Sequence, residues 1–256
     1  MTVSPRREIV AIEGEPDDPG LREMIGVRAG GASREAMKRH LGHLRGTPLY
    51  QLIDDYAGAS LVAGWALTRW VSPGEAFKGS SGRDMTGICT GFSPGSQAMD
   101  EKGFSIFSIQ SATRVVPLAN PEDPDGIHAM PEMTGKRFRR ARRIDLWREE
   151  EVIRFDAGFQ DSGSTPDGTL DAVHEYRVYG EVNPETGTLI SLQALPLILP
   201  YAECPGASMK ASRMVGRSVA GFRDDVPEIL ASTMGCTHLN DVLRALSDIP
   251  ALAQHL

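Results

Sequence analysis

The stretch Ala172-Val-His-Glu-Tyr-Arg-Val-Tyr-Gly-Glu-Val182 alternates apolar and polar side chains, the pattern of a β-strand with one buried face. Asn183-Pro-Glu-Thr-Gly187 follows as a turn, and Thr188-Leu-Ile-Ser-Leu-Gln193 alternates again, so the three segments predict a hairpin. Two more alternating segments precede it, Arg143–Trp147 and Val152–Phe159. Four such strands in succession predict an antiparallel meander, whose apolar face needs a cover.

Segments with helical spacing flank this meander and could supply the cover. Asp224 or Asp225 is the expected cap of one helix, which Gly235 ends, and Thr237 is the expected cap of a second helix. The second helix carries an apolar stripe of Leu239, Val242, Leu243 and Leu246. Ser33 is the expected cap of an N-terminal helix. We therefore predict an α+β fold, an antiparallel meander packed by an N-terminal helix and C-terminal helices.

The first half of the chain is less regular than the second. Residues 1–32 are predicted to be irregular, followed by one domain over residues 33–256, with two halves (33–134 and 135–256) as the alternative. The apolar segment Ser60–Val71 predicts a buried strand. Residues 73–103 predict a loop with a short strand near Met85–Phe92, and the alternation from Phe104 to Val116 predicts another strand.

The bulk composition excludes several classes of protein. The 256 residues are 41% hydrophobic and 24% charged, with a net charge of −7, so a general nucleic-acid binder is disfavoured. Three cysteines do not form a disulfide framework, and no segment has the roughly 20 apolar residues of a membrane span. We expect a soluble cytoplasmic protein without a membrane or nucleic-acid partner, either as a monomer or as a homo-oligomer.

One segment is strongly basic, although the net charge of the chain is negative. Lys136–Arg143 holds six basic residues in eight. Such a run could bind phosphate groups, or it could be a solvated face paired with the acidic residues at 149–151. The acidic net charge favours the solvated face.

The stretch Gly235-Cys-Thr-His238 is the strongest candidate for chemistry. A thiol at a helix N-terminus meets the positive end of the helix dipole and free N–H groups, which lower its pKa. The same N–H groups could stabilise a developing oxyanion. His174 and Tyr176 share the predicted apolar face of the sheet, where the last helix would pack over them. The plain alternative is that Cys236, His174 and His238 are core residues.

Two chemical alternatives stay open at this point. His174, Cys204, Cys236 and His238 form a two-His, two-Cys set that zinc accepts, although no Cys-x-x-Cys spacing supports it. The other alternative is acid–base catalysis by His174 without a cofactor. Further candidates for that chemistry are Asp55 to orient the imidazole, Asp161 and Arg114 to hold substrate, and Trp65 as a pocket wall or a plain core residue.

Three motifs carry a resemblance to a bacterial domain family of unknown function: Ala172–Arg177, Pro200–Gly206 and Gly235–Leu239. The similarity covers residues 135–256. Leu49–Asp55, Gly91–Gly95 and Arg142–Asp145 also resemble the actinobacterial branch of that family. The resemblance implies no activity, so the chemistry is argued from the residues.

The sequence has no Gly-x-Gly-x-x-Gly, no P-loop and no Gly-x-Ser-x-Gly motif. Our hypothesis is a cofactor-independent enzyme, a lyase or isomerase, that acts by proton transfer in bacterial catabolism of a partly apolar small molecule. The catalytic candidates are His174, Cys236, His238 and Asp55, and the substrate-binding candidates are Arg114, Tyr176, Trp65 and Asp161. A zinc-dependent hydrolase and a non-catalytic binding or scaffold domain are the alternatives.

Overall fold

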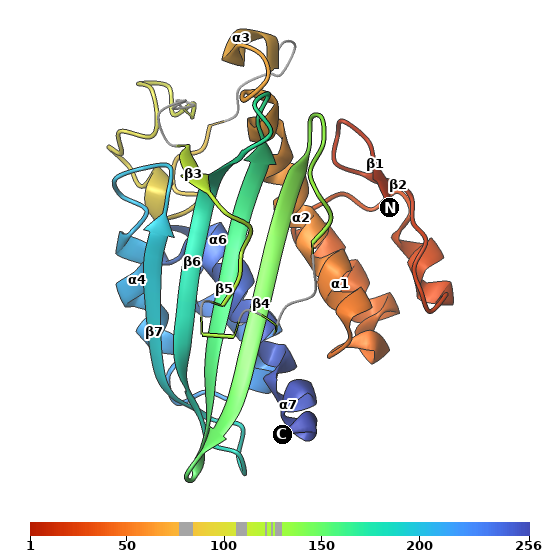
Figure 1. Ribbon diagram of the computed structural model, residues 1–256, viewed down its shortest axis with the longest axis vertical. Helices are drawn as coiled ribbons and strands as arrows, with labels where there is room; N and C mark the ends of the chain where they lie inside the picture. Colours follow the sequence, from red (N-terminus) through yellow and green to blue (C-terminus); the bar gives the residue numbers. More distant parts are fainter. Residues whose placement is uncertain (77–83, 106–111, 121, 124, 126–129) are drawn as a thin grey trace. The chain divides into compact units, whose positions relative to one another are not determined.

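The computed structural model describes residues 1–256 except 77–83, 106–111, 121, 124 and 126–129 (Figure 1). The chain forms two compact units, residues 1–63 and 64–256, which divide inside helix α2 (Pro48–Leu67).

The N-terminal unit packs short elements around a small apolar core. Strands β1 (Thr2–Val3) and β2 (Ile9–Ala11) pair antiparallel, so the segment expected to be irregular contains some regular structure. The 3₁₀ helix η1 (Pro19–Met24), helix α1 (Gly31–His40), the 3₁₀ helix η2 (Gly42–Leu44) and the first part of α2 follow. Helix α1 begins two residues before Ser33, whose hydroxyl accepts a hydrogen bond from the Gly30 N–H.

The C-terminal unit contains the antiparallel meander that the sequence predicts. Long strands β4 (Phe138–Glu149), β5 (Val152–Ser164), β6 (Leu170–Val182) and β7 (Leu189–Ile198) lie side by side in that order (Figure 1). The short strand β3 (Thr113–Val115) pairs with the first residues of β6. A register shift between Asp161 and Ser162 bends β5 near its end.

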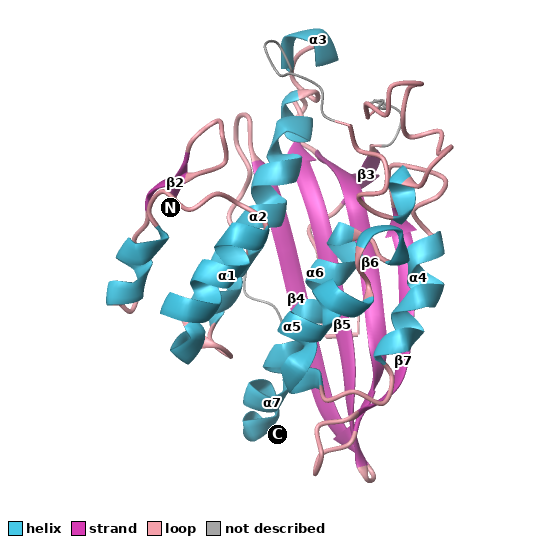
Figure 2. Ribbon diagram, turned by 180° about the vertical axis from the view of Figure 1, so that it is seen from behind, coloured by secondary structure: helices cyan, strands magenta, loops and turns pink. Residues whose placement is uncertain are grey.

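C-terminal helices cover one face of this sheet, which confirms the predicted α+β fold (Figure 2). These elements are α4 (Gly206–Lys210), η5 (Ala211–Met214), η6 (Val219–Gly221), α5 (Phe222–Ile229), η7 (Ser232–Met234), α6 (Thr237–Ala245), η8 (Leu246–Asp248), α7 (Ile249–Leu252) and η9 (Ala253–His255). Helix α6 packs on β5 and β6, where the fully buried rings of Phe159 and Tyr176 meet Leu239 and Leu243. Burial of this apolar face is the main force that holds the layers together.

The prediction of a strand over residues 60–71 was wrong. Helix α2 continues through this segment to Leu67, and turns follow it. A short apolar run fits a buried strand and a buried helix equally well, and here its Ala, Leu and Gly residues belong to a 20-residue helix.

Two further strand predictions in the first half also fail in part. Residues 85–92 form turns and the 3₁₀ helix η3 (Thr90–Phe92), after a short helix α3 (Pro73–Ala76). Of residues 104–116, only β3 is a strand, while Phe104 and Ser105 form isolated bridges and residues 106–111 lie outside the described chain. The Gly, Ser and Thr residues of this region favour local turns over the hydrogen-bonded pairing of strands.

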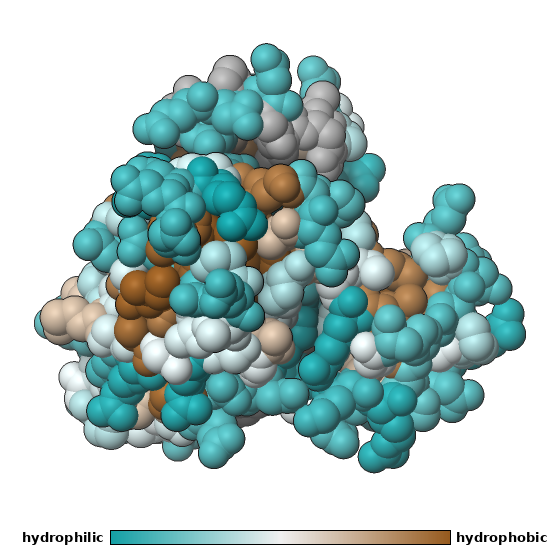
Figure 3. Space-filling model, turned by 90° about the horizontal axis from the view of Figure 1, so that it is seen from below, coloured by the Kyte–Doolittle hydropathy of each residue, from teal (hydrophilic) through white to brown (hydrophobic). Residues whose placement is uncertain are grey.

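Helix α5 begins at Phe222, before its expected caps, and Cys236 takes the cap position expected for Thr237. Across the described residues, no helix is long and apolar enough to cross a membrane. Hydrophilic side chains cover much of the face shown in Figure 3, with separate apolar patches among them.

Candidate active site

Asp161 is the centre of a polar cluster buried between the sheet and helix α6. Its carboxylate has no exposed surface and accepts two hydrogen bonds of 2.8 Å from Arg140, which lies directly opposite it on β4. Arg140 also donates to Asp241 of α6 at 2.8 Å. Burial alone would raise the pKa of Asp161, but the Arg140 charge, the adjacent His174 imidazole and the hydrogen bonds from Arg140 hold it well below its usual range. The carboxylate is therefore ionised.

Two imidazoles face the same oxygen of Asp161. His174, which pairs with Asp161 in the sheet, has its Nδ1 atom 3.5 Å from Oδ2, and His238 of α6 has its Nε2 atom 3.9 Å from Oδ2. The two rings stack with centroids 3.4 Å apart and planes inclined by 19°. Burial lowers the pKa of both imidazoles, and the closeness of His174 lowers the pKa of His238 further, because two imidazolium charges would repel each other. Both rings are therefore neutral at pH 7.

A thiol and a phenol extend the cluster towards the start of α6. The Cys236 sulfur lies 4.0 Å from Nδ1 of His238, and Cys236 occupies the N-cap position of α6 without a side-chain capping bond. We expected a lowered thiol pKa here, and that expectation was wrong. Burial raises the pKa of Cys236, and the nearby Tyr176 hydroxyl and the N–H groups of Leu239 and His238 do not compensate. Burial also raises the pKa of Tyr176, so its hydroxyl keeps its proton.

Three polar atoms of this cluster lack hydrogen-bond partners among the described residues: Nδ1 of His174, Nε2 of His238 and the Tyr176 hydroxyl. The two imidazole nitrogens lie beyond ordinary hydrogen-bond length from Asp161. Unpaired buried polar atoms are uncommon in folded proteins, because each one costs free energy. Several of them around one ionised carboxylate are typical of a functional site rather than of a packed core.

The sequence thus predicted His174, Tyr176, Asp161, Cys236 and His238, and the structure brings these five residues together. Trp65 also lies on this side of the sheet and is buried against Gly163, two residues beyond Asp161 on β5. It contributes to the core there, which was the simpler of its two predicted roles.

Of the remaining candidates, Arg114 lies outside the cluster. Arg114 is on β3, where its half-exposed guanidinium pairs with Asp167 at 3.1 Å and with Asp171 at 3.2 Å. Cys204 is buried next to Gly91 and Cys89, at the edge of the cluster and within electrostatic range of Cys236 and Tyr176. Asp55 belongs to the N-terminal unit, where it accepts a hydrogen bond from Gln51, so its catalytic role stays a prediction.

The donor set of the zinc hypothesis does not converge. Among the described residues, the atoms close enough to share a metal ion belong to Asp161, His174 and His238, without Cys204 or Cys236. This trio fits a metal poorly as well. A metal ion binds in the plane of an imidazole ring, but these two rings stack 3.4 Å apart, and Arg140 occupies both oxygens of Asp161.

Sequence reasoning missed Arg140 and Asp241. The basic segment 136–143 was expected to be a solvated face, yet it forms the first half of β4, and the Arg140 side chain is only 3% exposed. Its signal was the alternation itself. If β4 is extended back from Ile144 with period two, Arg140 falls on the same buried face, opposite an acidic residue of β5.

Comparison with known proteins places this cluster inside a defined domain. Residues 138–252 match the model of a family described as "Protein of unknown function (DUF2889)". The matched region runs from β4 to α7 and includes Arg140, Asp161, His174 and His238. No curated protein and no solved structure matches the chain.

Proposed function

We propose that the protein is a cofactor-independent enzyme that moves a proton on a small, partly apolar organic molecule, as a lyase or an isomerase. We place this reaction in bacterial catabolism in the cytoplasm, on a substrate that is neither nucleic acid nor lipid. The observation that carries the proposal is the ionised, fully buried Asp161 with two neutral imidazoles against one of its oxygens.

His174 is the proposed base. Asp161 faces its Nδ1 atom, so the tautomer with a proton on Nδ1 is favoured and Nε2 keeps the lone pair. When Nε2 takes a proton from a carbon of the substrate, the negative charge of Asp161 stabilises the imidazolium. The 3.5 Å separation would shorten as this charge develops. Arg140 fixes the carboxylate in position throughout the cycle.

The other residues suit the negative charge that forms on the substrate. The Tyr176 hydroxyl keeps its proton and lies beside the Cys236 sulfur, a weak acceptor, so it can donate to an enolate oxygen instead. His238 and the N-terminus of α6, with the neutral Cys236 thiol, line the same region. The proton then returns from His174 to another atom of the substrate or to a leaving group.

Exchange of substrate hydrogen with solvent tests this proposal without knowledge of the natural substrate. The protein would be incubated in D2O with a panel of carbon acids, such as aryl ketones and 1,3-dicarbonyl compounds, and deuterium uptake measured by mass spectrometry. We expect uptake that falls at least about a hundredfold in His174→Gln and in Asp161→Asn. His255→Gln, a change at an exposed histidine, is the matched control.

The alternatives give different results in the same assay. A non-catalytic binding domain would give no exchange above that of buffer with any member of the panel. Exchange that persists in His174→Gln while the variant stays folded would contradict the role of this imidazole.

A further inference from the structure

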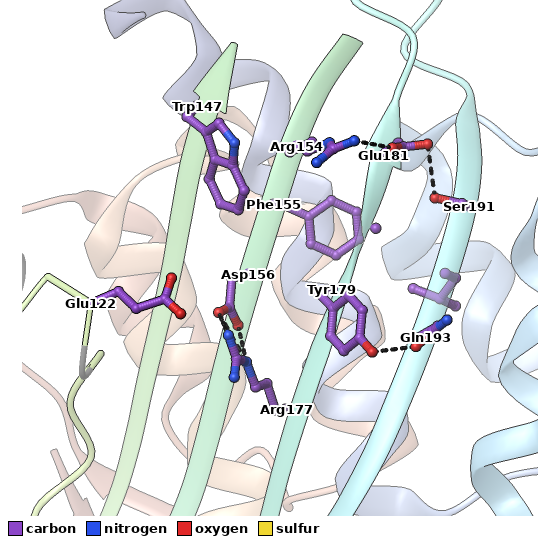
Figure 4. Close-up of a pocket in the computed structure, with 12 residues that line it drawn as sticks. Glu122, Trp147, Arg154, Phe155, Asp156, Arg177, Tyr179, Glu181, Ser191 and Gln193 are labelled. Atoms are coloured by element: carbon purple, nitrogen blue, oxygen red, sulfur yellow. Dashed lines mark hydrogen bonds and ion pairs between the residues drawn. The ribbon is translucent and has the colours of Figure 1, made fainter. Parts of the chain in front are cut away.

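The face of the sheet opposite helix α6 carries a second feature that the proton-transfer proposal does not use. Side chains of β4, β5, β6 and β7 that point away from the helices line a cleft of about 490 Å³ (Figure 4). Clefts of this volume are in the range of sites for small molecules. Asp161 and Asp156 lie five residues apart on β5, and they belong to opposite faces because successive side chains alternate.

Aromatic side chains form part of the wall of this cleft. Trp147 comes from β4 and Tyr179 from β6, on either side of β5. Trp147 pairs with Arg154 and Tyr179 with Asp156, so two strand spacings and a two-residue offset separate their backbones by about 12 Å, which leaves room for one compact organic group. Trp147 is 42% exposed, so its ring is accessible to a ligand.

The arginines of the cleft are already neutralised by neighbouring carboxylates. Arg177 makes hydrogen bonds of 2.9 and 3.0 Å to Asp156, which also accepts one of 3.1 Å from Arg143, and Arg143 pairs in turn with Asp145. Arg154 pairs with Glu149 at 2.9 Å and with Glu181 at 3.2 Å. An anionic ligand would have to compete with these contacts.

Glu122 leaves an excess of negative charge. Its carboxylate lines the cleft and makes no hydrogen bond within the described part of the chain, although it lies within electrostatic range of Arg177. The lining holds three carboxylates (Glu122, Asp156 and Glu181) and two guanidinium groups (Arg154 and Arg177). The chain as a whole has a net charge of −7, which adds to the attraction of a positive ligand.

We propose that this cleft binds an organic cation with an ammonium or quaternary ammonium head group, held between Trp147 and Tyr179 with Glu122 as its counter-charge. Aromatic faces attract such cations through their ring quadrupoles, and a nearby carboxylate adds to the attraction. This site is separate from the Asp161 cluster on the other face of the sheet, so the two proposals stand independently.

Three probes of matched shape and different charge test this assignment: choline, the neutral isostere 3,3-dimethylbutan-1-ol and the anion 3,3-dimethylbutanoate. Binding to the full chain would be measured by calorimetry and by the NMR shift of the Trp147 indole N–H. We expect choline to bind saturably, the neutral isostere to bind at least about fivefold more weakly, and the anion not to bind.

Variants locate the binding. Glu122→Gln should weaken choline binding about threefold to fivefold, and Trp147→Leu should weaken it at least as much. Glu228→Gln, at an exposed position on α5, should leave it unchanged. Equal binding of the neutral isostere, preference for the anion, or no saturable binding of choline would each overturn the assignment. Because Glu122 is exposed, its replacement tests the site without risk to the fold.

Discussion

The contact between Arg140 and Asp161 is the strongest single interaction of the candidate site. Both side chains are almost completely removed from water, and two hydrogen bonds of 2.8 Å join them. Replacement of Arg140 by Met would leave a buried carboxylate without its counter-charge, which typically costs about 3–5 kcal/mol. We expect this loss in the free energy of unfolding, measured by urea denaturation.

A matched control and a rescue make the result specific. Arg148→Met, at an exposed arginine of the same strand, should change the stability by less than about 0.5 kcal/mol. The double variant Arg140→Met/Asp161→Leu removes the buried charge as well, so it should recover a large part of the loss. A single variant as stable as the wild type would show that the pair contributes little.

The two histidines predict a pH dependence of stability. Both have a pKa below the usual value in the folded protein, so the unfolded chain binds more protons as the pH falls below about 6.5. Their contribution is complete above that pH and is lost as the pH falls towards their folded pKa values. The slope is at most about 1.4 kcal/mol per pH unit for each imidazole.

Denaturation curves between pH 7.5 and 5 measure this effect. The free energy of unfolding should fall over that range, and it should fall less steeply in His174→Gln/His238→Gln. His255→Gln, at an exposed histidine, is the control. An unchanged slope in the double variant would mean that the imidazoles are not buried in the neutral state.

The alternation of apolar and polar residues along β6 was enough to predict that His174 and Tyr176 lie on the buried face. The Gly235–His238 stretch predicted the other two residues of the site, Cys236 and His238. Sequence could not give the sign of the Cys236 pKa shift, because a helix N-terminus and burial act in opposite directions. The degree of burial decides which one dominates, and it depends on packing from distant segments.

At the scale of elements, the meander could be predicted because its strands alternate regularly and turn residues separate them. Helix α2 could not be predicted. Its apolar residues lack a clear period, and a continuous apolar run is compatible with either structure. The 3₁₀ helices around residues 90 and 233 were not predicted either, since contacts between distant segments hold them: Thr90 donates to the Thr233 and Gly235 carbonyls.

Gly235 links these elements to the site. A Cβ atom there would lie 2.3 Å from the Leu230 carbonyl oxygen and within 2.8 Å of the Asn240 side chain. Gly235→Ala must therefore displace backbone next to the cap of α6, which carries Cys236 and His238. We expect a loss of about 1–3 kcal/mol in the free energy of unfolding, measured by urea denaturation.

Gly74→Ala is the control, because no atom of the described residues lies within 4 Å of the added methyl group. If Gly235→Ala were as stable as Gly74→Ala, the close packing of η7 against α6 would be contradicted.

At the scale of the molecule, one sheet presents two chemically distinct faces. The face under α6 gathers an ionised carboxylate and two neutral imidazoles, whereas the opposite face carries paired charges and aromatic rings around an open cleft. Alternation of side chains along β5 and β6 produces both at once. The region matched by the family model contains these strands completely, whereas Glu122 of the cleft precedes that region.

The metal content of the whole protein distinguishes acid–base chemistry from a zinc hydrolase. The stacking of His174 on His238 and the two contacts from Arg140 leave Asp161 poorly arranged for an ion. Protein purified without a metal-affinity tag should therefore hold less than about a tenth of an equivalent of zinc, measured by elemental analysis. Incubation with a chelator should leave both the melting temperature and any deuterium exchange unchanged. If the protein held a structural zinc ion, its removal would lower the melting temperature, because such an ion stabilises the fold strongly. About one zinc per chain, lost in His174→Gln and in His238→Gln, would instead show that the imidazoles separate to bind a metal, and the proposed proton transfer would have to be abandoned.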